Sequence, residues 1–137
     1  MIVKMLFGKK KKRPEKAGHL DRKSLGKMGE DIACRYLRRN NYAILERNYR
    51  CRMGEVDIIA QKGDKVVFVE VKSQYEHVNI PILKKVGPHK QKKLAALANY
   101  YRRIRLPEDT PCRIDVITVI IDAGNHVRSI DHYENAV

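Results

Sequence analysis

The residues whose types and spacing could support chemistry lie in one short segment: Glu55, Asp57, Glu70 and Lys72. Gly63-Asp64, midway along this segment, is a favoured pair for a two-residue hairpin turn. With that turn, Asp57 lies opposite Glu70 on the neighbouring strand. In the same register, Glu55 lies opposite Lys72. Because side chains alternate along a strand, the four charged side chains share one face of the hairpin.

Directly opposed acidic side chains repel each other, and the remedy suggests a function. At an effective dielectric constant near 20, two carboxylates about 5 Å apart repel by roughly 3 kcal/mol. Either one carboxyl group keeps a proton or a cation lies between the two. Mg²⁺ binds oxygen ligands and retains several waters, so two carboxylates supply the protein ligands that it usually takes. We therefore predict that Asp57 and Glu70 bind Mg²⁺ or Mn²⁺.

Lys72 follows Glu70 by two residues and is expected to project beside the predicted metal ion. Its ammonium group could orient an attacking water or neutralise charge that develops on a phosphate. The alternative is a surface hairpin with two ion pairs, one of them between Glu55 and Lys72. The metal site is favoured because Asp57 faces an acid in the derived register.

The surrounding sequence predicts a sheet with helices packed on it, and hence an α/β fold. Ser24 is the expected N-cap of a helix that ends at Asn40-Asn41, and Gly26 and Gly29 on its apolar face allow close approach to a neighbour. The other expected elements are strands over 42–50, 55–61 and 65–74, a helix over 89–105, and strands over 113–121 and 126–133. The hairpin residues expected to face the core are Val56, Ile58, Ala60, Val67, Val69 and Val71.

Several of these segments resemble known protein families. The pattern D-x12-E-V-K, which covers Asp57, Glu70 and Lys72, is similar to the PD-(D/E)xK motif of restriction-endonuclease-like nucleases. Further segments within residues 24–121 resemble the bacterial YraN-like family, which is also similar to archaeal Holliday junction resolvases: GKMGEDIACRYL, ILERNYRCRMGEVDIIA, VVFVEVKSQ, KQKKLAALANYY and CRIDVITV.

The resemblance implies a restriction-endonuclease-like αβββαβ core with a mixed central sheet and flanking helices. It also implies a Mg²⁺- or Mn²⁺-dependent endonuclease that cleaves DNA phosphodiester bonds, with branched DNA as one candidate substrate. Glu30 matches the acid of a G-E-x-x-A segment that assists the metal in resolvase-like relatives, the alternative being an exposed glutamate at the helix border. The expected metal ligands are thus Asp57, Glu70 and Glu30, and Lys72 joins them as the fourth expected catalytic residue.

The chain is strongly basic, with 29 Lys and Arg against 16 Asp and Glu and a net charge of +13. This balance is typical of proteins with a polyanionic partner, here DNA bound through its phosphate backbone, with RNA left open. A solvated basic surface without a partner is the alternative. No apolar run approaches the length of a membrane span, so no membrane partner is expected. The residues expected to contact nucleic acid are Lys90, Arg47, Arg50 and Arg52.

Two positions indicate whether this chain has the substrate contacts of the family. Lys90 matches the lysine of the family's K-x-x-x-L segment and is assigned to phosphate contact, with simple extension into solvent as the alternative. Gln74 departs from the family pattern, which has arginine or a similar base after E-V-K-S/T. The loop that follows Gln74 also fits the family pattern poorly.

Length and cysteine content predict one domain in a reducing compartment. Residues 1–22 are expected to form a basic, flexible N-terminal arm, and residues 23–137 a single nuclease-like domain. The three cysteines are widely spaced and predict neither a disulfide framework nor a zinc site. Reduced cysteines suit the cytoplasm.

Asp115 and the histidines are interpreted as structural residues. Asp115 lies within an apolar strand and needs a partner there, which we expect to be an arginine such as Arg47 or Arg50 and not a metal ion. The histidines have no metal-binding spacing and are expected in loops: His19, His77, His89, His126 and His132.

Three functions follow from these observations. The first is a metal-dependent nuclease that acts on DNA. The second is a non-catalytic nucleic-acid-binding module with the same fold. The third is a protein interaction domain that uses the strand over 126–133 as an exposed sheet edge. The sequence leaves open whether the chain forms a homodimer.

Overall fold

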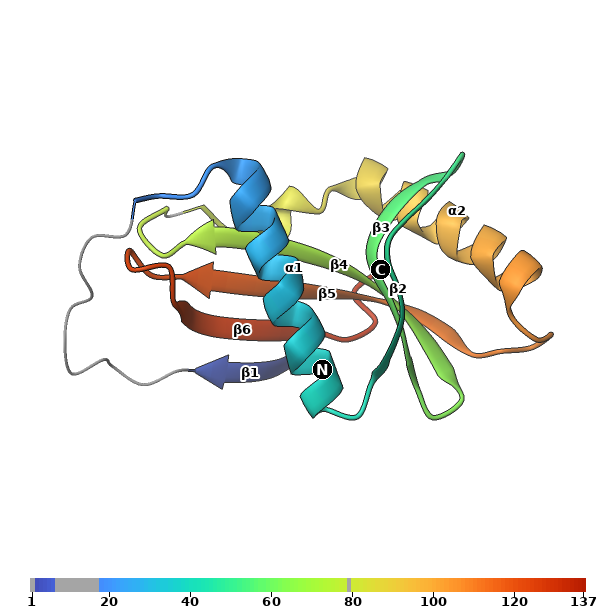
Figure 1. The fold of residues 1–137 in the computed structure, drawn as a ribbon. Helices are drawn as coiled ribbons and strands as arrows, with labels where there is room; N and C mark the ends of the chain where they lie inside the picture. The colour runs from blue at the N-terminus through green and yellow to red at the C-terminus, as the bar shows by residue number, and fades with distance from the viewer. Residues whose placement is uncertain (1, 7–17, 79) are drawn as a thin grey trace.

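A six-stranded mixed sheet forms the centre of the computed structural model, which describes residues 2–6, 18–78 and 80–137 (Figure 1). The strand order is β1-β6-β5-β4-β3-β2, and only β4 and β5 run parallel to each other. The elements are β1 (Ile2–Leu6), α1 (Arg22–Arg39), β2 (Ala43–Cys51), β3 (Gly54–Lys62), β4 (Lys65–Tyr75), the 3-10 helix η1 (Ile82–Lys85), α2 (Pro88–Arg105), β5 (Cys112–Ile121) and β6 (Val127–Tyr133).

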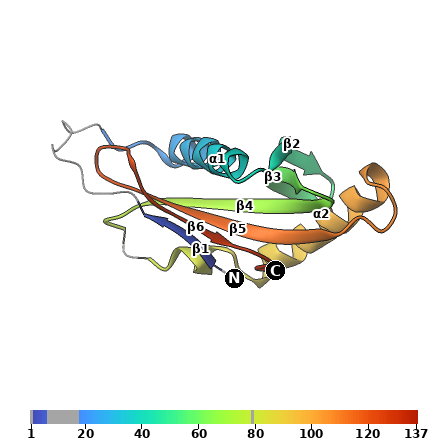
Figure 2. The same ribbon diagram turned by 90° about the horizontal axis from the view of Figure 1, so that it is seen from below.

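The two long helices pack on opposite faces of the sheet (Figures 1 and 2). Odd-numbered β4 residues such as Val67 and Val69 belong to the core under α1, whereas Val66 and Phe68 belong to the core under α2. This confirms the α/β class, the mixed sheet and the predicted order of the elements from α1 to β6.

Both faces of the β3–β4 hairpin are buried along much of its length. Ile58 lies in the core as predicted, where it packs under α1, but Ile59 and Phe68 on the other face pack under α2. The prediction of one apolar and one charged face was therefore wrong for the turn-proximal half, because α2 lies over it. Val56 packs under α2 and not, as predicted, with Ile58.

The N-terminal segment differs from the predicted flexible arm where the structure describes it. Residues Ile2–Leu6 form β1 and pair antiparallel with β6, which therefore has neighbours on both sides. The expectation that the strand over 126–133 is an exposed edge was thus wrong. Most of the predicted basic arm, residues 7–17, lies outside the described residues.

Helix α1 begins one turn earlier than the predicted cap and lies very close to β4. Its N-cap is Asp21, whose side chain accepts a hydrogen bond of 2.7 Å from the backbone N–H of Ser24. A Cβ atom at Gly29 would lie 1.7 Å from Oγ of Ser73 on β4, so glycine is required at this contact. A Cβ at Gly26 would meet nothing within 4 Å. The close approach was predicted correctly for Gly29 and wrongly for Gly26.

A buried cluster of polar side chains, which we call the Asp115 cluster, joins β5 and β6 to α1. The Asp115 carboxylate accepts hydrogen bonds from Nε of Arg113 (3.0 Å), from Nε2 of His132 (2.7 Å) and from the backbone N–H of Asn135 (2.9 Å). Nδ1 of His132 lies 3.0 Å from the Tyr36 hydroxyl on α1. Burial alone would raise the pKa of Asp115, but these hydrogen bonds lower it below its usual value.

The cluster confirms a structural role for Asp115 and corrects two details. Its arginine partner is Arg113, two residues away on the same strand, whereas Arg47 and Arg50 pair with other acids. His132 lies in strand β6 and is 1% exposed, so the prediction that it belongs to a loop was wrong.

Candidate functional site

The hairpin register agrees with the prediction near the turn. Five residue pairs, from Lys62 and Lys65 at the turn to Ile58 and Val69, have the expected partners. Gly63 has a φ of 60°, a left-handed conformation that glycine adopts readily at such a turn. The ladder ends at Ile58, so β3 and β4 separate immediately before the predicted acidic pair.

Asp57 lies where the two strands separate. Its Oδ2 accepts a 2.7 Å hydrogen bond from the backbone N–H of Val71, so the side chain replaces a strand-to-strand backbone contact. On β2, Asn48 lies between the partners of Ile58 and Val56 and has a left-handed φ of 51°. Side-chain alternation along β3 breaks at the same place, because Val56 and Ile58 pack under different helices. The irregular backbone therefore directs the Asp57 carboxylate towards β4.

Glu70 is the acidic partner of Asp57 and is only 3% exposed. Burial, a hydrogen bond to Asp57 and the charge of Asp57 together raise the pKa of Glu70 to about 8, while the Lys90 ammonium acts against this shift. Nζ of Lys90 lies 3.1 Å from Oε2 of Glu70. Oε2 accepts no well-oriented hydrogen bond from the described residues, so the Lys90 contact is chiefly electrostatic. We call Asp57 and Glu70 the carboxylate pair.

Beyond the carboxylate pair the predicted register does not continue. Lys72 is paired with Thr118 of β5 in the sheet, and it is half-buried without an ion-pair partner among residues 2–6, 18–78 and 80–137. Glu55 is paired with Arg50 of β2, and Nε of Arg50 lies 3.0 Å from Oε2 of Glu55. The predicted contact between Glu55 and Lys72 was wrong, because β3 leaves β4 at Asp57 and follows β2.

Glu30 approaches the carboxylate pair from α1. The pKa of Glu30 is raised overall, first by burial and then by the charge of Asp57. A hydrogen bond with Asn48 opposes this rise only in part. Glu70 faces the α2 side of β4, so Glu30 and Glu70 reach Asp57 from opposite faces of the sheet. Across the described part of the chain, no group of three or more His, Cys, Asp or Glu side chains is positioned to hold a metal ion.

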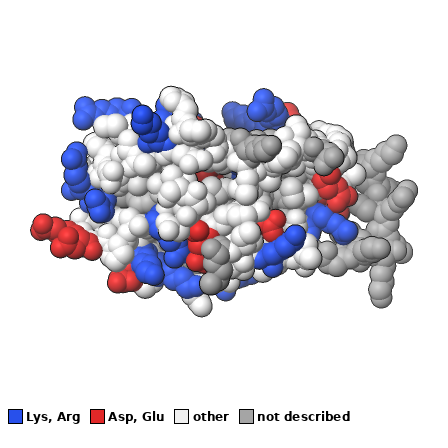
Figure 3. Space-filling model, turned by 180° about the vertical axis from the view of Figure 1, so that it is seen from behind, with Lys and Arg blue, Asp and Glu red and all other residues white. Residues whose placement is uncertain are grey.

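The predicted nucleic-acid contacts do not form one patch. Arg47 donates a 2.6 Å hydrogen bond to Asp31 of α1, and Arg52 is exposed in the turn between β2 and β3. Figure 3, which shows the face opposite α1, has Lys and Arg side chains spread along its margins around a largely uncharged centre. Neither described long helix has the apolar character required to cross a membrane.

Two of the predicted contacts, Arg50 and Lys90, line a groove of about 390 Å³ between the β2–β3 turn and the start of α2. We call this the β2–α2 groove. Its other lining residues are Cys51, Gly54, Glu55, His89 and Lys93. Sequence reasoning missed Lys93, although it follows Lys90 by three residues and so shares a helix face with it.

Gln74, the departure from the family pattern, positions the loop after β4. Its Nε2 donates hydrogen bonds to the backbone carbonyls of Val78 (3.1 Å) and Ile80 (2.9 Å). These bonds hold the chain as it leaves β4 on the way to η1 and α2. Gln74 therefore supports the segment that leads to Lys90.

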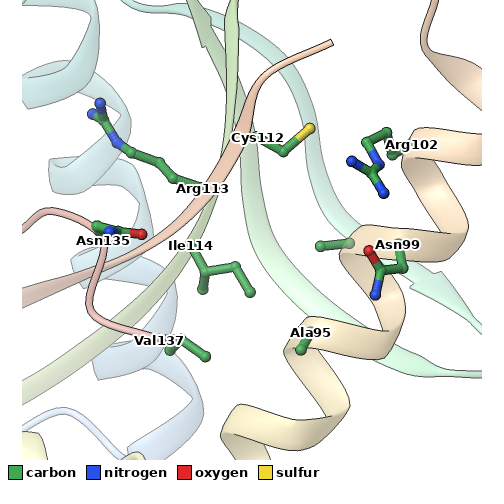
Figure 4. A pocket seen from close by; sticks show the side chains of 9 residues that line it. Ala95, Asn99, Arg102, Cys112, Arg113, Ile114, Asn135 and Val137 are labelled. Carbon is green, nitrogen blue, oxygen red and sulfur yellow. The ribbon is translucent and has the colours of Figure 1, made fainter. Parts of the chain in front are cut away.

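A second cavity, of about 200 Å³, lies between α2, β5 and the C-terminal residues. Figure 4 shows Asn99 and Arg102 approaching Cys112 from α2, while Arg113 extends away along the other side of β5. Burial raises the pKa of the Cys112 thiol, which disfavours the reactive thiolate. This cavity lacks the acidic pair found between β3 and β4.

The fold and the site define a class: an α/β protein with a mixed six-stranded sheet, a helix on each face, and an acidic pair where two strands separate. The chain belongs to the uncharacterised protein family UPF0102, whose model matches residues 29–119. The matched segment contains Glu30, the carboxylate pair, Lys72 and Lys90.

Similar proteins of the same family occur in several bacteria. A UPF0102 protein of Geotalea uraniireducens is 42% identical over 116 residues, which are 85% of this chain and 91% of that protein. A UPF0102 protein of Pelotomaculum thermopropionicum is 38% identical over 115 residues, or 84% of this chain and 96% of that protein. A UPF0102 protein of Syntrophus aciditrophicus is 45% identical over 95 residues, which are 69% of this chain and 74% of that protein. UPF0102 is the YraN-like family that the sequence was expected to belong to, so these likenesses confirm that expectation. The names of the relatives state no activity.

Proposed function

We propose that this protein is a metal-dependent nuclease that cleaves DNA phosphodiester bonds. The observation that carries the proposal is the carboxylate pair, in which a nearly buried Glu70 lies beside Asp57 with its pKa raised to about 8. Such a pair is unfavourable without a proton or a cation. The element order from α1 to β5 and the pattern D-x12-E-V-K are both those expected of a restriction-endonuclease-like core.

The chemistry of the carboxylate pair fits Mg²⁺ or Mn²⁺. Both side chains offer oxygen atoms, and Oε2 of Glu70 accepts no well-oriented hydrogen bond from the described residues. Asp57 and Glu70 would hold the ion, whereas Glu30, predicted as a further ligand, approaches Asp57 from the other face of the sheet. When bound, the ion would polarise a phosphate oxygen and lower the pKa of a bound water.

The chain's own residues supply positioning and charge. Lys72 follows Glu70 on β4 and carries an ammonium group that has no ion-pair partner in the described part of the chain. In the proposed reaction it orients the attacking water or stabilises charge that develops on the phosphate. Arg50, Arg52 and Lys90 would bind the phosphate backbone, largely without regard to sequence. Three free cysteines suit the proposed cytoplasmic location.

Isothermal titration calorimetry with Mn²⁺ tests the metal site first. Asp57→Asn and Glu70→Gln each remove one charged ligand, so each is expected to weaken Mn²⁺ binding by about tenfold or more. Glu55→Gln is the matched control, because Glu55 lies on the same hairpin but pairs with Arg50 and should leave the affinity unchanged. Cleavage of duplex, nicked, single-stranded and branched DNA with Mg²⁺ then identifies the substrate. Absence of Mn²⁺ binding, both alone and with DNA, would overturn the proposal.

The Lys90–Glu70 contact supports a second candidate, a non-catalytic nucleic-acid-binding module. Lys90 partly neutralises Glu70 without any metal, so the fold itself does not require an ion there. A binding module would show DNA affinity that is independent of divalent ions and unaffected by Asp57→Asn. A nuclease loses cleavage in that variant.

A further inference from the structure

Lys90 belongs to two neighbouring environments at once. Its ammonium nitrogen lies 3.1 Å from Oε2 of the nearly buried Glu70, yet its side chain is 31% exposed and lines the β2–α2 groove. Lysine has a flexible four-carbon stem that can redirect its charge over several ångströms. The residue can therefore serve either the carboxylate or the groove without movement of the helix.

The β2–α2 groove has the charge expected of a site for a phosphodiester group. Three cationic side chains line it, from Arg50, Lys90 and Lys93, against the single carboxylate of Glu55. Arg50 is held by Glu55, and Lys93 is exposed without an ion-pair partner in the described chain. His89 adds a hydrogen-bonding imidazole at the start of α2. A singly charged phosphodiester suits this balance.

Occupation of the carboxylate pair by a divalent ion would change what Lys90 does. An ion bound to the carboxylate pair neutralises the negative charge of the pair, which attracts the Lys90 ammonium, and it repels that ammonium directly. Both effects favour a Lys90 rotamer that points into the groove. Lys93 lies one turn further along α2 and also lines the groove. Lys90 forms an ion pair with Glu70, whereas Lys93 does not.

We propose that the β2–α2 groove binds a nucleic-acid phosphodiester group next to the metal site, and that Lys90 exchanges between the two. Without metal, Lys90 lies against Glu70 of the carboxylate pair; with metal bound, it turns into the groove and contacts the phosphate. The inference rests on the proposed metal site. Because coupling between two bound ligands is reciprocal, metal strengthens phosphate binding and phosphate strengthens metal binding.

Acetylation of lysines, followed by mass spectrometry of the full chain's peptides, tests the movement of Lys90. Mg²⁺ alone is expected to raise the acetylation rate of Lys90 severalfold, because the ammonium leaves Glu70, while Lys93 stays unchanged as the internal control. Addition of a single-stranded oligonucleotide should then protect both lysines. In Asp57→Asn, Mg²⁺ should leave the Lys90 rate unchanged.

Fluorescence anisotropy with a labelled oligonucleotide tests the coupling, with Ca²⁺ in place of Mg²⁺ to limit cleavage. Lys93→Met should weaken binding severalfold both with and without Ca²⁺. Lys90→Met should weaken oligonucleotide binding mainly when Ca²⁺ is present. The substitution should therefore remove most of the increase in affinity that Ca²⁺ causes. Arg103→Met, further along α2 and outside the groove, is the matched control and should keep that enhancement.

The two proposals fail in different ways. If calorimetry shows metal binding that depends on Asp57 and Glu70, but Lys90 acetylation is unchanged by Mg²⁺, the Lys90 exchange is wrong and the nuclease proposal stands. If no divalent ion binds, alone or with oligonucleotide, both proposals are wrong. If Lys93→Met and Lys90→Met both leave the affinity unchanged, the groove is not the phosphate site.

Discussion

Two buried carboxyl groups on neighbouring strands of one sheet have pKa values that are shifted in opposite directions. Asp115 of β5 is 0% exposed, and its hydrogen bonds from Arg113, His132 and a backbone N–H lower its pKa. Glu70 of β4 is 3% exposed, and burial together with Asp57 raises its pKa to about 8. The two side chains are almost equally buried, so the difference between their pKa values comes from the groups that contact them.

The contrast separates a structural acid from an acid that is available for a ligand. Every contact of Asp115 favours its charged form, which is the arrangement expected of a group that joins strands to a helix. Glu70 has one cation and one acid beside it, and its charged form remains unfavourable in the folded protein. Perturbed acids of this second kind are concentrated at functional sites.

The largest expected effect comes from breaking the Asp115 cluster. Asp115→Asn leaves the buried His132 without its charged partner and leaves Arg113 with Glu134 at 3.9 Å, and we expect a loss of about 3–5 kcal/mol in the free energy of unfolding. Urea unfolding followed by circular dichroism at neutral pH measures it. In the parent this contribution should disappear as the pH falls below 3.8 through the lowered pKa of Asp115.

A milder variant keeps this test decisive if Asp115→Asn fails to fold. Tyr36→Phe removes only the hydroxyl that lies 3.0 Å from Nδ1 of His132, and should cost about 1 kcal/mol. A loss below half of that in Tyr36→Phe would mean that the link from α1 to the Asp115 cluster does not stabilise the fold.

Glu70→Gln is expected to show the opposite dependence on pH. The folded protein holds the Glu70 proton up to a pKa of about 8, whereas the unfolded chain releases it near 4.5. The folded state therefore binds more protons between these values, and the parent loses stability as the pH rises through this range. The variant lacks this loss, so its stability relative to the parent should improve by about 2–4 kcal/mol from pH 4.5 to pH 9.

Urea unfolding at several pH values, without divalent ions, checks this behaviour. Glu76→Gln is the control, because Glu76 is exposed at the end of the same strand and should show no such trend. A constant difference between Glu70→Gln and the parent across the pH range would place the Glu70 pKa near its ordinary value. The contrast with Asp115 would then be lost.

The sequence predicted the parts of the fold that depend on local pattern. The turn at Gly63-Asp64 and strand alternation determine the register from Lys62 to Ile58, and the structure has that register. Local hydrogen bonding and side-chain alternation are sufficient for that part of the hairpin, because no other element alters its pairing. Asp57 also lies beside Glu70 as predicted, but it does so through the irregular backbone beyond the end of the ladder.

The failures around the carboxylate pair involve contacts with distant segments. Glu55 was expected opposite Lys72, but β3 leaves β4 and Glu55 pairs with Arg50 of β2. The left-handed conformation of Asn48, opposite the break, has no local signature strong enough to predict it. Lys90 as the partner of Glu70 depends on how α2 docks, which a hydrophobic period alone does not determine.

The Asp115 cluster was missed for a related reason. Tyr36, His132 and Asn135 come from α1, β6 and the residues after β6, so no spacing along the chain brings them to Asp115. An acid within an apolar strand did indicate that a buried partner was needed. Its basic partner, Arg113, lies two residues away on the same strand face, so strand alternation was the signal that could have found it.

The smallest expected effect concerns α1, which contacts both acidic regions. Tyr36 on this helix reaches His132 of the Asp115 cluster and Glu30 lies near Asp57 of the carboxylate pair, so one helix positions residues beside both regions. Gly29→Ala would place a Cβ 1.7 Å from Oγ and 2.9 Å from Cβ of Ser73. We expect a loss of about 1–2 kcal/mol in the free energy of unfolding, because α1 must shift away from β4.

Gly26→Ala is the matched control on the same helix. Its Cβ would meet nothing within 4 Å, so the better helix propensity of alanine should stabilise the protein by up to about 1 kcal/mol. Gly29→Ala combined with Ser73→Ala removes the nearer clash and should recover part of the loss. If Gly29→Ala is instead as stabilising as Gly26→Ala, α1 has room above β4. Glu30 and Tyr36 would then not be held in place by close packing of α1 on β4 at Ser73.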